Sequence, residues 1–438
     1  MRTRSASIVV LAWLLLIAVV PAGAQDGKQP PQTGFEESEG ESWTTHEQEL
    51  EFLAEVDARS ARADVRVVAE TPQGRPIHLV RIGAPRPGTA ARSRREPTIL
   101  FVCTQHGNEP APREACLKLL RDLAFTDDQE LVSLIRSATV LFIPTANPDG
   151  REANTRGNSA GTDINRDHLN LETVEARAIA TVVRVWRPDA TLDLHEYGPS
   201  LPAIYDDEIL YLWPRNLNVD SQVHDLAQQL AIDYIAKQAE EEGYSADEYG
   251  QYAVGDQNVF QSAGGPDEGI ARNAMGLRHS LGILIESAVT SDPRNGPQEI
   301  TSEAAVRIRR VDSHMVASHA ALSFMIERGQ EAMEVTAGAF RRKEKEGSDR
   351  SAPVYFGGAD NEEPSEDDVV DPPPCGYRLT SQQLDDVRAT MRLLGISFKR
   401  ASKGAYVTMA QPPEPVIPLL LDERGDRHSV SAEPDMEC

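Results

Sequence analysis

The segment Thr98-Ile-Leu-Phe-Val-Cys103 is a continuous apolar run, which is typical of a β-strand that is buried on both faces of a sheet. Three similar runs follow it, at residues 138–144, 190–195 and 281–286. Segments in which apolar residues have helical spacing separate these runs or follow the last one. They cover residues 110–123, 172–186, 218–237 and 302–326. This alternation predicts an α/β fold with a mainly parallel sheet that helices cover on both faces.

Residues that can carry chemistry stand at the ends of these predicted strands. They are His106, Asn147, His195 and Glu286. Ligand sites in sheets of this kind gather at the carboxyl ends of the strands. We therefore expect these four residues to share one site.

The first candidates are metal ligands. In His106-Gly-Asn-Glu109, a histidine and an acid at positions i and i+3 follow a buried strand and can point at one ion. His195 ends another buried strand. Two histidines and one glutamate suit a catalytic zinc ion, with the fourth position left to water. Taken singly, the first motif also fits a surface loop, and His195 also fits a hydrogen-bonded histidine of the core.

Two further carboxylates suit supporting roles. Glu286 closes an apolar strand, where desolvation would raise its pKa toward the value of a useful general base. Asp163 could hold the free ring nitrogen of a zinc-bound histidine. The alternatives are a solvent-facing glutamate at a strand end and an aspartate that forms a turn.

A loop rich in glycine and asparagine carries Arg156, Asn165 and Arg166. The planar fork of arginine binds a carboxylate through two hydrogen bonds, and near a metal it can stabilise an oxyanion. In isolation, both arginines also fit solvated positions on a loop.

Taken together, these motifs resemble the carboxypeptidase A-like zinc carboxypeptidases over about residues 45–330. The matching pieces, in chain order, are His106-x-x-Glu109, Asn147-Pro-Asp-Gly150, Arg156, Asp163-Ile-Asn-Arg166, His195 and Glu286. The resemblance implies a three-layer α/β/α sandwich around a mixed, mainly parallel sheet of eight strands.

The resemblance also implies a role for each residue at the reaction centre. One zinc ion would be bound by His106, Glu109 and His195. Glu286 would act as the general base toward a zinc-activated water and later as the acid. Arg156 would polarise the scissile carbonyl group.

Other implied roles concern the substrate. Asn165 and Arg166 would bind the terminal carboxylate of a peptide, and Asp163 would hold His106. Arg272 lies where a specificity residue would sit, and facing the pocket it would favour an acidic side chain; a structural ion pair is the alternative. The family usually has a mobile tyrosine before its catalytic glutamate, but residues 261–285 contain none. Tyrosines stand further upstream, at positions 244, 249 and 252.

These roles describe an enzyme, a zinc metallocarboxypeptidase that hydrolyses peptide bonds near a free C-terminal carboxylate. One alternative is a zinc amidohydrolase of N-acyl amino acids, similar to the desuccinylase and aspartoacylase relatives. Another is a peptidase of cell-wall stem peptides. A third is a silent binding module, whose sign would be a missing ligand or a missing Glu286. The segment Asn147-Pro-Asp-Gly150 and the secretory signal described next favour the peptidase.

The ends of the chain differ from its middle. Residues 1–24 combine Arg2 and Arg4, an apolar stretch at residues 8–20 and a small-residue cleavage site, which predicts a signal peptide and a secreted or periplasmic protein. A retained membrane anchor is the alternative, although the apolar stretch is shorter than the roughly 20 residues of a span.

We expect five segments along the chain. They are the signal peptide at residues 1–24, a polar leader at 25–45, the zinc carboxypeptidase domain at 46–340, an acidic, proline-rich linker at 341–374 and a small α+β domain at 375–438. In the last segment, residues 381–394 have helical spacing, and residues 405–409 and 416–421 resemble strands.

Charge and cysteine content limit the partners and the compartment. The chain of 438 residues has 44 basic and 69 acidic residues, a net charge of −25. This excess argues against nucleic acid and anionic membranes as partners. The resemblance to zinc carboxypeptidases implies a peptide with a free C-terminus as the partner. Of the four cysteines, Cys103 and Cys116 fit packed thiols, whereas Cys375 and Cys438 could form a disulfide in an oxidising compartment.

Overall fold

The structure is a computed structural model, and it describes residues 29–198, 207–255, 258–262, 265–289 and 302–438, with residues 251–262 described by their backbone alone. The predicted signal peptide at residues 1–24 lies outside these ranges. Residues 31–438 form one compact unit. Among the described helices, none combines the length and the apolar character that a membrane span requires.

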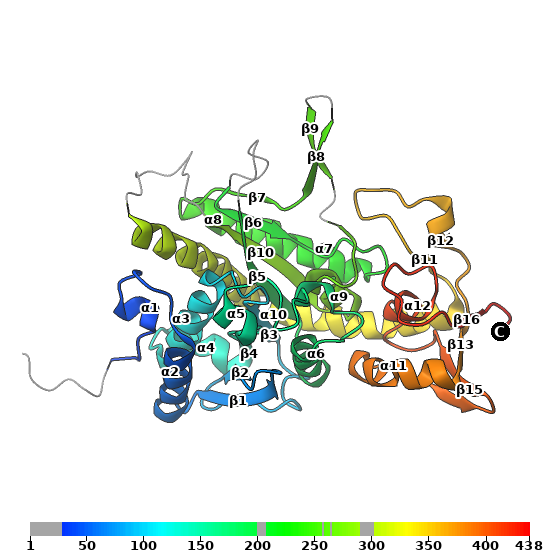
Figure 1. The fold of residues 1–438 in the computed structure, drawn as a ribbon, viewed down its shortest axis with the longest axis horizontal. Helices are drawn as coiled ribbons and strands as arrows, with labels where there is room; N and C mark the ends of the chain where they lie inside the picture. The colour runs from blue at the N-terminus through cyan, green and yellow to red at the C-terminus, as the bar shows by residue number, and fades with distance from the viewer. Residues whose placement is uncertain (1–28, 199–206, 256–257, 263–264, 290–301) are drawn as a thin grey trace, which may run out of the picture. The chain divides into compact units, whose positions relative to one another are not determined.

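A mixed sheet of eight strands lies at the centre of this unit. Its strands are β1 Ala63–Glu70, β2 Pro76–Ile82, β3 Thr98–Cys103, β4 Thr139–Ile143, β5 Ala190–Tyr197, β6 Ile209–Leu212, β7 Ala246–Glu248 and β10 Leu281–Ala288. They lie in the order β1-β2-β4-β3-β5-β10-β6-β7, from the bottom to the top of Figure 1. The four apolar runs of the sequence form β4, β3, β5 and β10, which are parallel to one another. The predicted mixed, mainly parallel sheet is confirmed.

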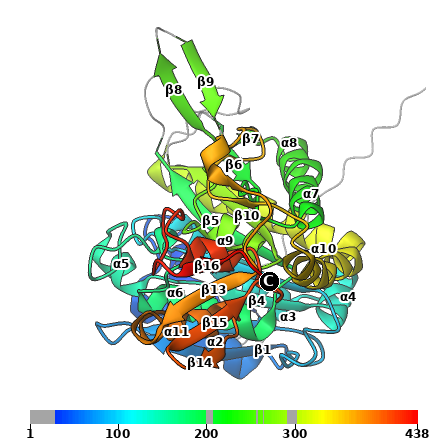
Figure 2. The same ribbon diagram turned by 90° about the vertical axis from the view of Figure 1, so that its right-hand side faces the viewer.

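Helices cover both faces of this sheet, which confirms the α/β/α sandwich. On one face, α6 (Val174–Trp186) packs against Leu100 and Val102 of β3. On the other face, α3 (Ala111–Phe125), α7 (Ser221–Gln229) and α10 (Glu303–Asp349) pack with Ile99 and Phe101 of the same strand. Successive side chains of a strand point to opposite faces, so β3 is apolar throughout. Figure 2 shows α6 on one side of the strands and α3, α7 and α10 on the other.

Shorter elements connect these layers. They are α1 Gly34–Glu37, α2 His46–Arg59, α4 Gln129–Ser137, α5 Pro148–Ala153, a 3-10 turn Ile164–Arg166, a π-helix Leu230–Ala236, α8 Lys237–Glu241, β8 Gln251–Gly255, β9 Asn258–Ser262 and α9 Ala271–Leu277. Strands β8 and β9 pair only with each other among the described residues.

The described part of the predicted polar leader at residues 25–45 packs against the sandwich. The ring of Phe35 stacks on Trp43 with their centroids 5.0 Å apart, and Phe35 is buried. Glu36 pairs with Arg121 of α3 at 2.6 Å. The acidic composition of this segment led to the prediction, whereas its two aromatic residues decide where it lies.

The last helix of the sandwich is longer than the sequence predicts. The predicted helix covers residues 302–326, but α10 continues to Asp349, into the segment predicted as a linker. Gly329, Gly338 and Gly347 have low helix propensity, which hides this continuation in the sequence. Gly347 is needed for packing, since a Cβ atom there would collide with the carbonyl oxygen of Met409.

The remainder of the predicted linker is also held in place. Strands β11 (Val354–Tyr355) and β12 (Val369–Val370) pair with each other. Asp360 accepts a hydrogen bond from the indole Nε1 of Trp213 at 2.9 Å and pairs with Arg215 at 2.6 Å. His224 contacts the same carboxylate at 2.8 Å. At least this acid of the predicted linker is bound to side chains of the sandwich.

Residues 375–438 form a small α+β region, as predicted. Its antiparallel sheet has the order β14-β15-β13-β16, with β13 Gly376–Thr380, β14 Lys399–Ala401, β15 Gly404–Thr408 and β16 Glu433–Asp435. Helix α11 (Ser381–Leu394) packs against β13, β15 and α6. The strand predicted at residues 416–421 is wrong, because this run forms α12 (Val416–Leu421). A short apolar run that is buried on all sides does not distinguish a strand from a helix.

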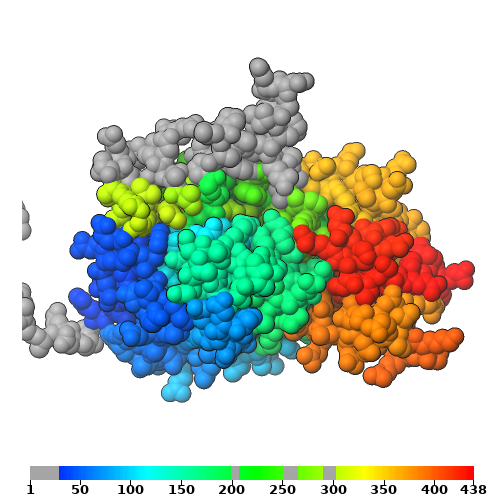
Figure 3. All heavy atoms as spheres, viewed as in Figure 1, coloured from blue at the N-terminus to red at the C-terminus, as the bar shows by residue number. Residues whose placement is uncertain are grey.

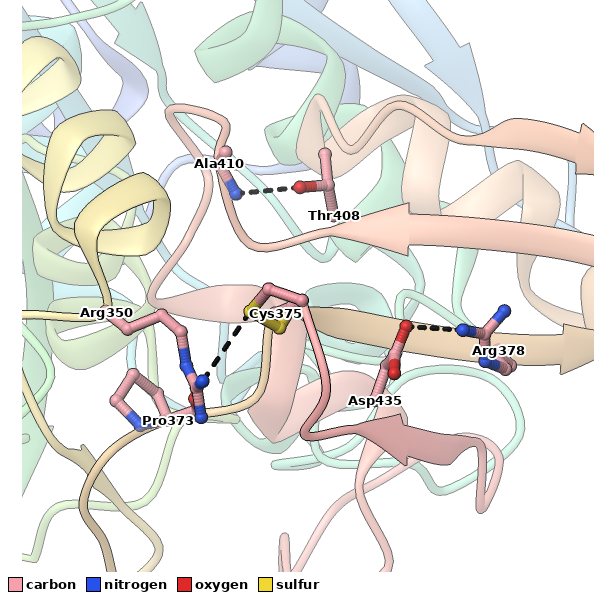
Figure 4. The surroundings of a disulfide bond; sticks show 8 residues. Arg350, Pro373, Cys375, Arg378, Thr408, Ala410 and Asp435 are labelled. Atoms are coloured by element: carbon pink, nitrogen blue, oxygen red, sulfur yellow. Dashed lines mark hydrogen bonds and ion pairs between the residues drawn. A yellow bond between two sulfur atoms is a disulfide. The ribbon is translucent and has the colours of Figure 1, made fainter.

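Two disulfides connect the four cysteines. Cys375 and Cys438 are bonded, which confirms the predicted pair, and Figure 4 shows their surroundings. Nearby, Arg350 donates to the carbonyl oxygen of Pro373 at 2.7 Å. The expectation of packed thiols at Cys103 and Cys116 is wrong, because these residues are bonded to each other. The end of β3 and the following helix α3 lie side by side, with the two Cα atoms 6.7 Å apart.

The Cys375–Cys438 bond is expected to stabilise the small C-terminal sheet. It spans 63 residues of sequence and ties the residue before β13 to the chain end beyond β16. A Cys438→Ser variant should lower the local stability of β13 and β16 by about 2–4 kcal/mol, because the unfolded segment gains freedom. Hydrogen exchange of the amides in these strands measures this loss. Cys375→Ser and the double variant should give the same loss, and a much larger loss in the double variant would contradict the assignment.

Candidate active site

Two of the predicted metal ligands follow β3, and the third lies near the end of β5. These parallel strands are neighbours in the sheet, and Cys103 of β3 is in register with Leu194 of β5. The residues that follow β3 therefore lie beside His195. The ligand atoms of His106, Glu109 and His195 all lie within 4.8 Å of one another, and all three residues are buried. The structure thus brings together the three residues that the sequence singles out.

The inner atoms of this cluster fit a cation. Nδ1 of His106 lies 2.8 Å from Oε1 of Glu109, and Nδ1 of His195 lies 2.9 Å from Oε2 of the same carboxylate. The two Nδ1 atoms lie 3.0 Å apart. Burial would raise the pKa of Glu109, but the charges and hydrogen bonds of the two histidines lower it to about 2. Two imidazoles and an ionised carboxylate that converge in this way are a donor set that zinc prefers.

An aspartate holds each histidine from its outer side. Nε2 of His106 lies 3.1 Å from Oδ1 of Asp163, and Nε2 of His195 lies 2.8 Å from Oδ2 of Asp193. Such contacts fix the ring and leave Nδ1 to face a metal. Burial opposes the ionisation of Asp163, but the hydrogen bond from His106 and the charges of His106 and Arg156 hold its pKa well below the usual range.

Asp193 is a site residue that the sequence reasoning missed. It lies two residues before His195 in β5, so both side chains are on the same face of the strand. Burial would raise its pKa, but the charge of His195 and hydrogen bonds from His195 and Gln105 lower it. The signal was present in Leu192-Asp-Leu-His195, because an acid inside an apolar strand needs a partner on its own face.

Glu286 reaches the same site from the third parallel strand. It lies in β10 in register with His195 of β5. Its side chain is partly buried, and this burial, together with the negative charge of Glu109, raises its pKa to about 7 against the opposing charges of the two histidines. A carboxyl group with such a pKa can both accept and donate a proton near neutral pH.

Arg156 lies beside the cluster of His106, Glu109 and His195 and remains half-exposed. Its Nη1 atom is 3.2 Å from Nδ1 of His106 and 3.6 Å from Oε1 of Glu109. Its Nε atom donates to Oδ2 of Asp163 at 3.0 Å. The side chain is 49% exposed, so the guanidinium group can meet a substrate that enters from solvent.

Contact between Gly107 and Gly150 explains why the motif of His106 occurs together with the motif of Asn147. A Cβ atom on Gly107 would collide with the backbone of Gly150, so these two backbones are in direct contact. Asn147 holds both sides, since its Nδ2 donates to the carbonyl oxygen of Gln105 at 3.0 Å and its Oδ1 accepts from the amide of Gly150 at 2.9 Å. The motif that contains Asn147 therefore supports the turn that positions His106.

The two predicted carboxylate-binding residues differ in their surroundings. Asn165 is buried, and its Nδ2 donates to Asp193 at 3.2 Å while its Oδ1 accepts from the amide of Ala271 at 2.7 Å. Arg166 is exposed, and its Nη1 donates to the carbonyl oxygen of Asn165 at 2.7 Å. No carboxylate of the described residues pairs with Arg166. The arginine therefore has a free charge, whereas the amide of Asn165 is already used within the protein.

Arg427 of the C-terminal region supports this segment, and nothing in the sequence indicated it. Its Nη1 donates to the carbonyl oxygen of Arg166 at 3.1 Å, and its Nη2 pairs with Asp267 at 2.6 Å. A Cβ atom on Gly269 would lie 2.7 Å from Nε of Arg427, so the loop before α9 also lies against this side chain. Figure 3 shows the red C-terminal atoms against the green atoms of the sandwich.

Arg272, the predicted specificity residue, and Tyr249, one of the three upstream tyrosines, lie near the site. Arg272 is buried, and its Nη2 donates to the carbonyl oxygen of Gly265 at 2.9 Å. Burial raises the pKa of Tyr249. The negative charge of Glu286 raises this pKa further, and the positive charge of Arg272 lowers it, so Tyr249 lies close enough to interact with both side chains. The ring centroid of Tyr244 instead lies 3.5 Å from the guanidinium carbon of Arg309. The side chain at position 252 is outside the described residues.

Comparison with known proteins gives matches to carboxypeptidases. A family model described as zinc carboxypeptidase matches residues 49–278. Probable carboxypeptidase 2 of Trichophyton verrucosum is 29% identical over 278 residues, which are 61% of this chain and 52% of that protein. Carboxypeptidase 2 of Trichophyton equinum is 32% identical over 189 residues, 42% of this chain and 35% of that protein. The chain spans at most about half the length of these relatives.

Solved structures with a similar chain path have the same kind of description. A putative carboxypeptidase from Burkholderia mallei has a TM-score of 0.49 and 20% identity, and the match covers 63% of this chain and 67% of that one. A metallo-carboxypeptidase from Pseudomonas aeruginosa has a TM-score of 0.46 and 20% identity, with 65% and 69% covered. The match to the family model extends over more than half of the chain. The chain therefore belongs to the zinc carboxypeptidase family.

Proposed function

We propose that the protein is a zinc-dependent metallocarboxypeptidase that hydrolyses peptide bonds near a free C-terminal carboxylate. The observation that carries this proposal is the buried cluster of His106, Glu109 and His195, with Glu286 in register beside it. The family membership and the curated relatives, which are named carboxypeptidases, support the same reaction.

In this proposal, His106, Glu109 and His195 hold one zinc ion. When bound there, zinc supplies a Lewis acid that lowers the pKa of water and polarises a carbonyl group. Asp163 and Asp193 keep the two imidazole rings in the tautomer that presents Nδ1 to the ion.

Glu286 moves the proton. An ionised carboxylate oxygen of Glu286 accepts a proton from the water that attacks the scissile carbonyl carbon. The same oxygen then donates this proton to the nitrogen of the leaving amine. Because burial raises the pKa of Glu286 to about 7, the group is close to balance between its two forms near neutral pH.

Arginine side chains position the substrate. The half-exposed guanidinium group of Arg156 donates to the carbonyl oxygen as negative charge develops there. Arg166, which has no carboxylate partner among the described residues, binds the terminal carboxylate of the peptide. Asn165 lies beside this carboxylate and also braces Asp193. We propose Arg272 as a specificity residue that favours an acidic side chain.

We also propose that the protein acts outside the cytoplasm. Its two disulfides are typical of proteins that fold in an oxidising compartment. The predicted signal peptide at residues 1–24 agrees with this location.

Zinc binding should depend on His195 and on pH. Burial lowers the pKa of His195, but Asp193 and Glu109 raise it well above 6.5 in the metal-free site. Below that pKa the ion must displace a proton, so zinc affinity should fall by up to about tenfold for each unit that the pH is lowered. Competition with a chromophoric chelator at several pH values measures this slope. His195→Gln should lose the one bound zinc, and His319→Gln should keep it; full zinc content in His195→Gln would refute the site.

Replacing Glu286 should remove hydrolysis and leave the fold intact. Glu286→Gln cannot accept the proton, so kcat should fall by at least about 10²-fold while the zinc content stays the same. Release of C-terminal residues from a peptide ladder measures kcat, and Glu303→Gln, at an exposed position of α10, is the matched control. Full activity of Glu286→Gln would overturn the mechanism. Hydrolysis of N-acyl amino acids in place of peptides would favour the amidohydrolase alternative.

Arg427 should affect substrate binding through Arg166. The Arg427→Gln variant loses the pair with Asp267, which is about one-third exposed, and weakens the support of the Arg166 backbone. We expect KM for a peptide with a free C-terminus to rise about fivefold, or about 1 kcal/mol, with kcat within twofold. Arg424→Gln, which breaks a pair with Asp422 in the same region, is the control. An equal rise in KM for both variants would show a general loss of stability.

A further inference from the structure

A cavity lies near one end of the central strands, opposite to the end that carries the candidate active site. Its volume is about 240 Å³, and its lining includes Arg184, Arg187, Arg278, His279, Phe340 and Leu394. Two of these side chains precede β10, which begins at Leu281, and two precede β5, which begins at Ala190. The cavity therefore lies near the amino ends of strands whose other ends carry His195 and Glu286.

Three arginines gather at this cavity without a counter-charge. No carboxylate among the described residues pairs with Arg184, Arg187 or Arg278. Burial lowers the pKa of Arg278 to about 10, and the charge of Arg184 acts in the same direction. Burial also lowers the pKa of Arg187, together with the charges of Arg94 and Arg184. The chain has 69 acidic residues against 44 basic ones, so acids to neutralise this cluster are abundant in the sequence.

The acid nearest to Arg187 in sequence is already used. Asp189 is buried, and its carboxylate accepts hydrogen bonds from Oγ1 of Thr336 at 2.6 Å and from the amide of Thr98 at 2.8 Å. It lines a neighbouring cavity and not this one. Asp189 therefore does not offset the positive charge at the cavity that Arg184, Arg187 and Arg278 line.

The cavity also has a buried polar atom without a partner. His279 is 2% exposed, and burial lowers its pKa to about 4, so the ring is neutral. Its Nε2–H donates to the carbonyl oxygen of Pro412 at 2.8 Å. In that tautomer Nδ1 is an acceptor, and it has no hydrogen-bond partner within the described part of the chain. A buried polar atom of this kind usually has a partner in a native protein, so this acceptor is unsatisfied in the structure.

Apolar side chains complete the walls. The ring of His279 packs edge-on against Phe340, with the centroids 4.6 Å apart. The guanidinium carbon of Arg187 lies 5.0 Å from the centroid of the same phenyl ring. Val183, Leu394 and Pro412 also line the cavity. Positive charge at one part and an apolar lining at another select a molecule that has both characters.

We propose that this cavity binds a small organic anion, a carboxylate or a phosphate monoester that carries an apolar group. The oxyanion lies among Arg184, Arg187 and Arg278, and the apolar group lies against Phe340 and Leu394. Because α6, α10 and α11 all line the cavity, the bound anion joins the sandwich to the C-terminal region.

Calorimetric titration of the zinc-loaded full chain with phenyl phosphate and with phenylacetate at low salt tests this proposal. We expect saturable binding of at least one probe that persists in Arg166→Gln, and the preferred probe identifies the oxyanion. The Arg184→Gln/Arg187→Gln double variant should bind at least tenfold more weakly. Both side chains are exposed, so the variant should fold; Arg184→Gln alone provides a second, milder test with a smaller loss.

Two control variants separate this site from other sources of binding. Arg177→Gln removes an exposed arginine of the same helix α6 that does not line the cavity, and it should bind as the wild type does. Arg166→Gln separates binding here from binding at the candidate active site: it should keep the binding that the double variant loses, and any binding that it loses itself belongs to the active site. Three results would overturn the proposal: no saturable binding of either probe, unchanged affinity in the double variant, or an equal loss in Arg177→Gln.

Discussion

Parallel pairing of β3, β5 and β10 is the constraint on which the site depends. The pairing aligns Cys103 with Leu194 and His195 with Glu286, so the residues at the carboxyl ends of these strands meet at one place. The strands are buried on both faces, and packing on each side fixes this register. A shift by one residue would turn each side chain to the opposite face and scatter the cluster.

A cluster of buried ionisable groups needs partners, and most of the polar architecture supplies them. Each imidazole contacts Glu109 with one nitrogen and an aspartate with the other. Asn165 then connects Asp193 to the amide of Ala271, at the start of α9. Removal of one partner would leave a buried charge uncompensated, which is more unfavourable than the loss of one contact. The site is therefore best regarded as one hydrogen-bonded network.

The C-terminal region is part of the structural support of this site. Helix α10 leads into it without a break, and Gly347 allows the helix to approach the carbonyl oxygen of Met409 closely. Arg427 contacts the backbone of Arg166. Asp360, in the segment predicted as a linker, binds Trp213 and Arg215. The net negative charge of the chain does not predict the local charge at the candidate active site or at the cavity lined by three arginines. The local charge depends on which ionised side chains are paired there.

Sequence alone determined the central strands, the covering helices and the candidate metal ligands His106, Glu109 and His195, because apolar runs and strand-end polar residues are local patterns. It left out Asp193, Arg427 and the Cys103–Cys116 bond, whose partners are distant in the chain. It also ended α10 early, because glycines that close packing requires look locally like the end of a helix. It predicted a strand where α12 forms, because a short buried apolar run fits either structure. Only the tertiary structure decided which side chains have partners, because a hydrogen bond or an ion pair depends on distance in space.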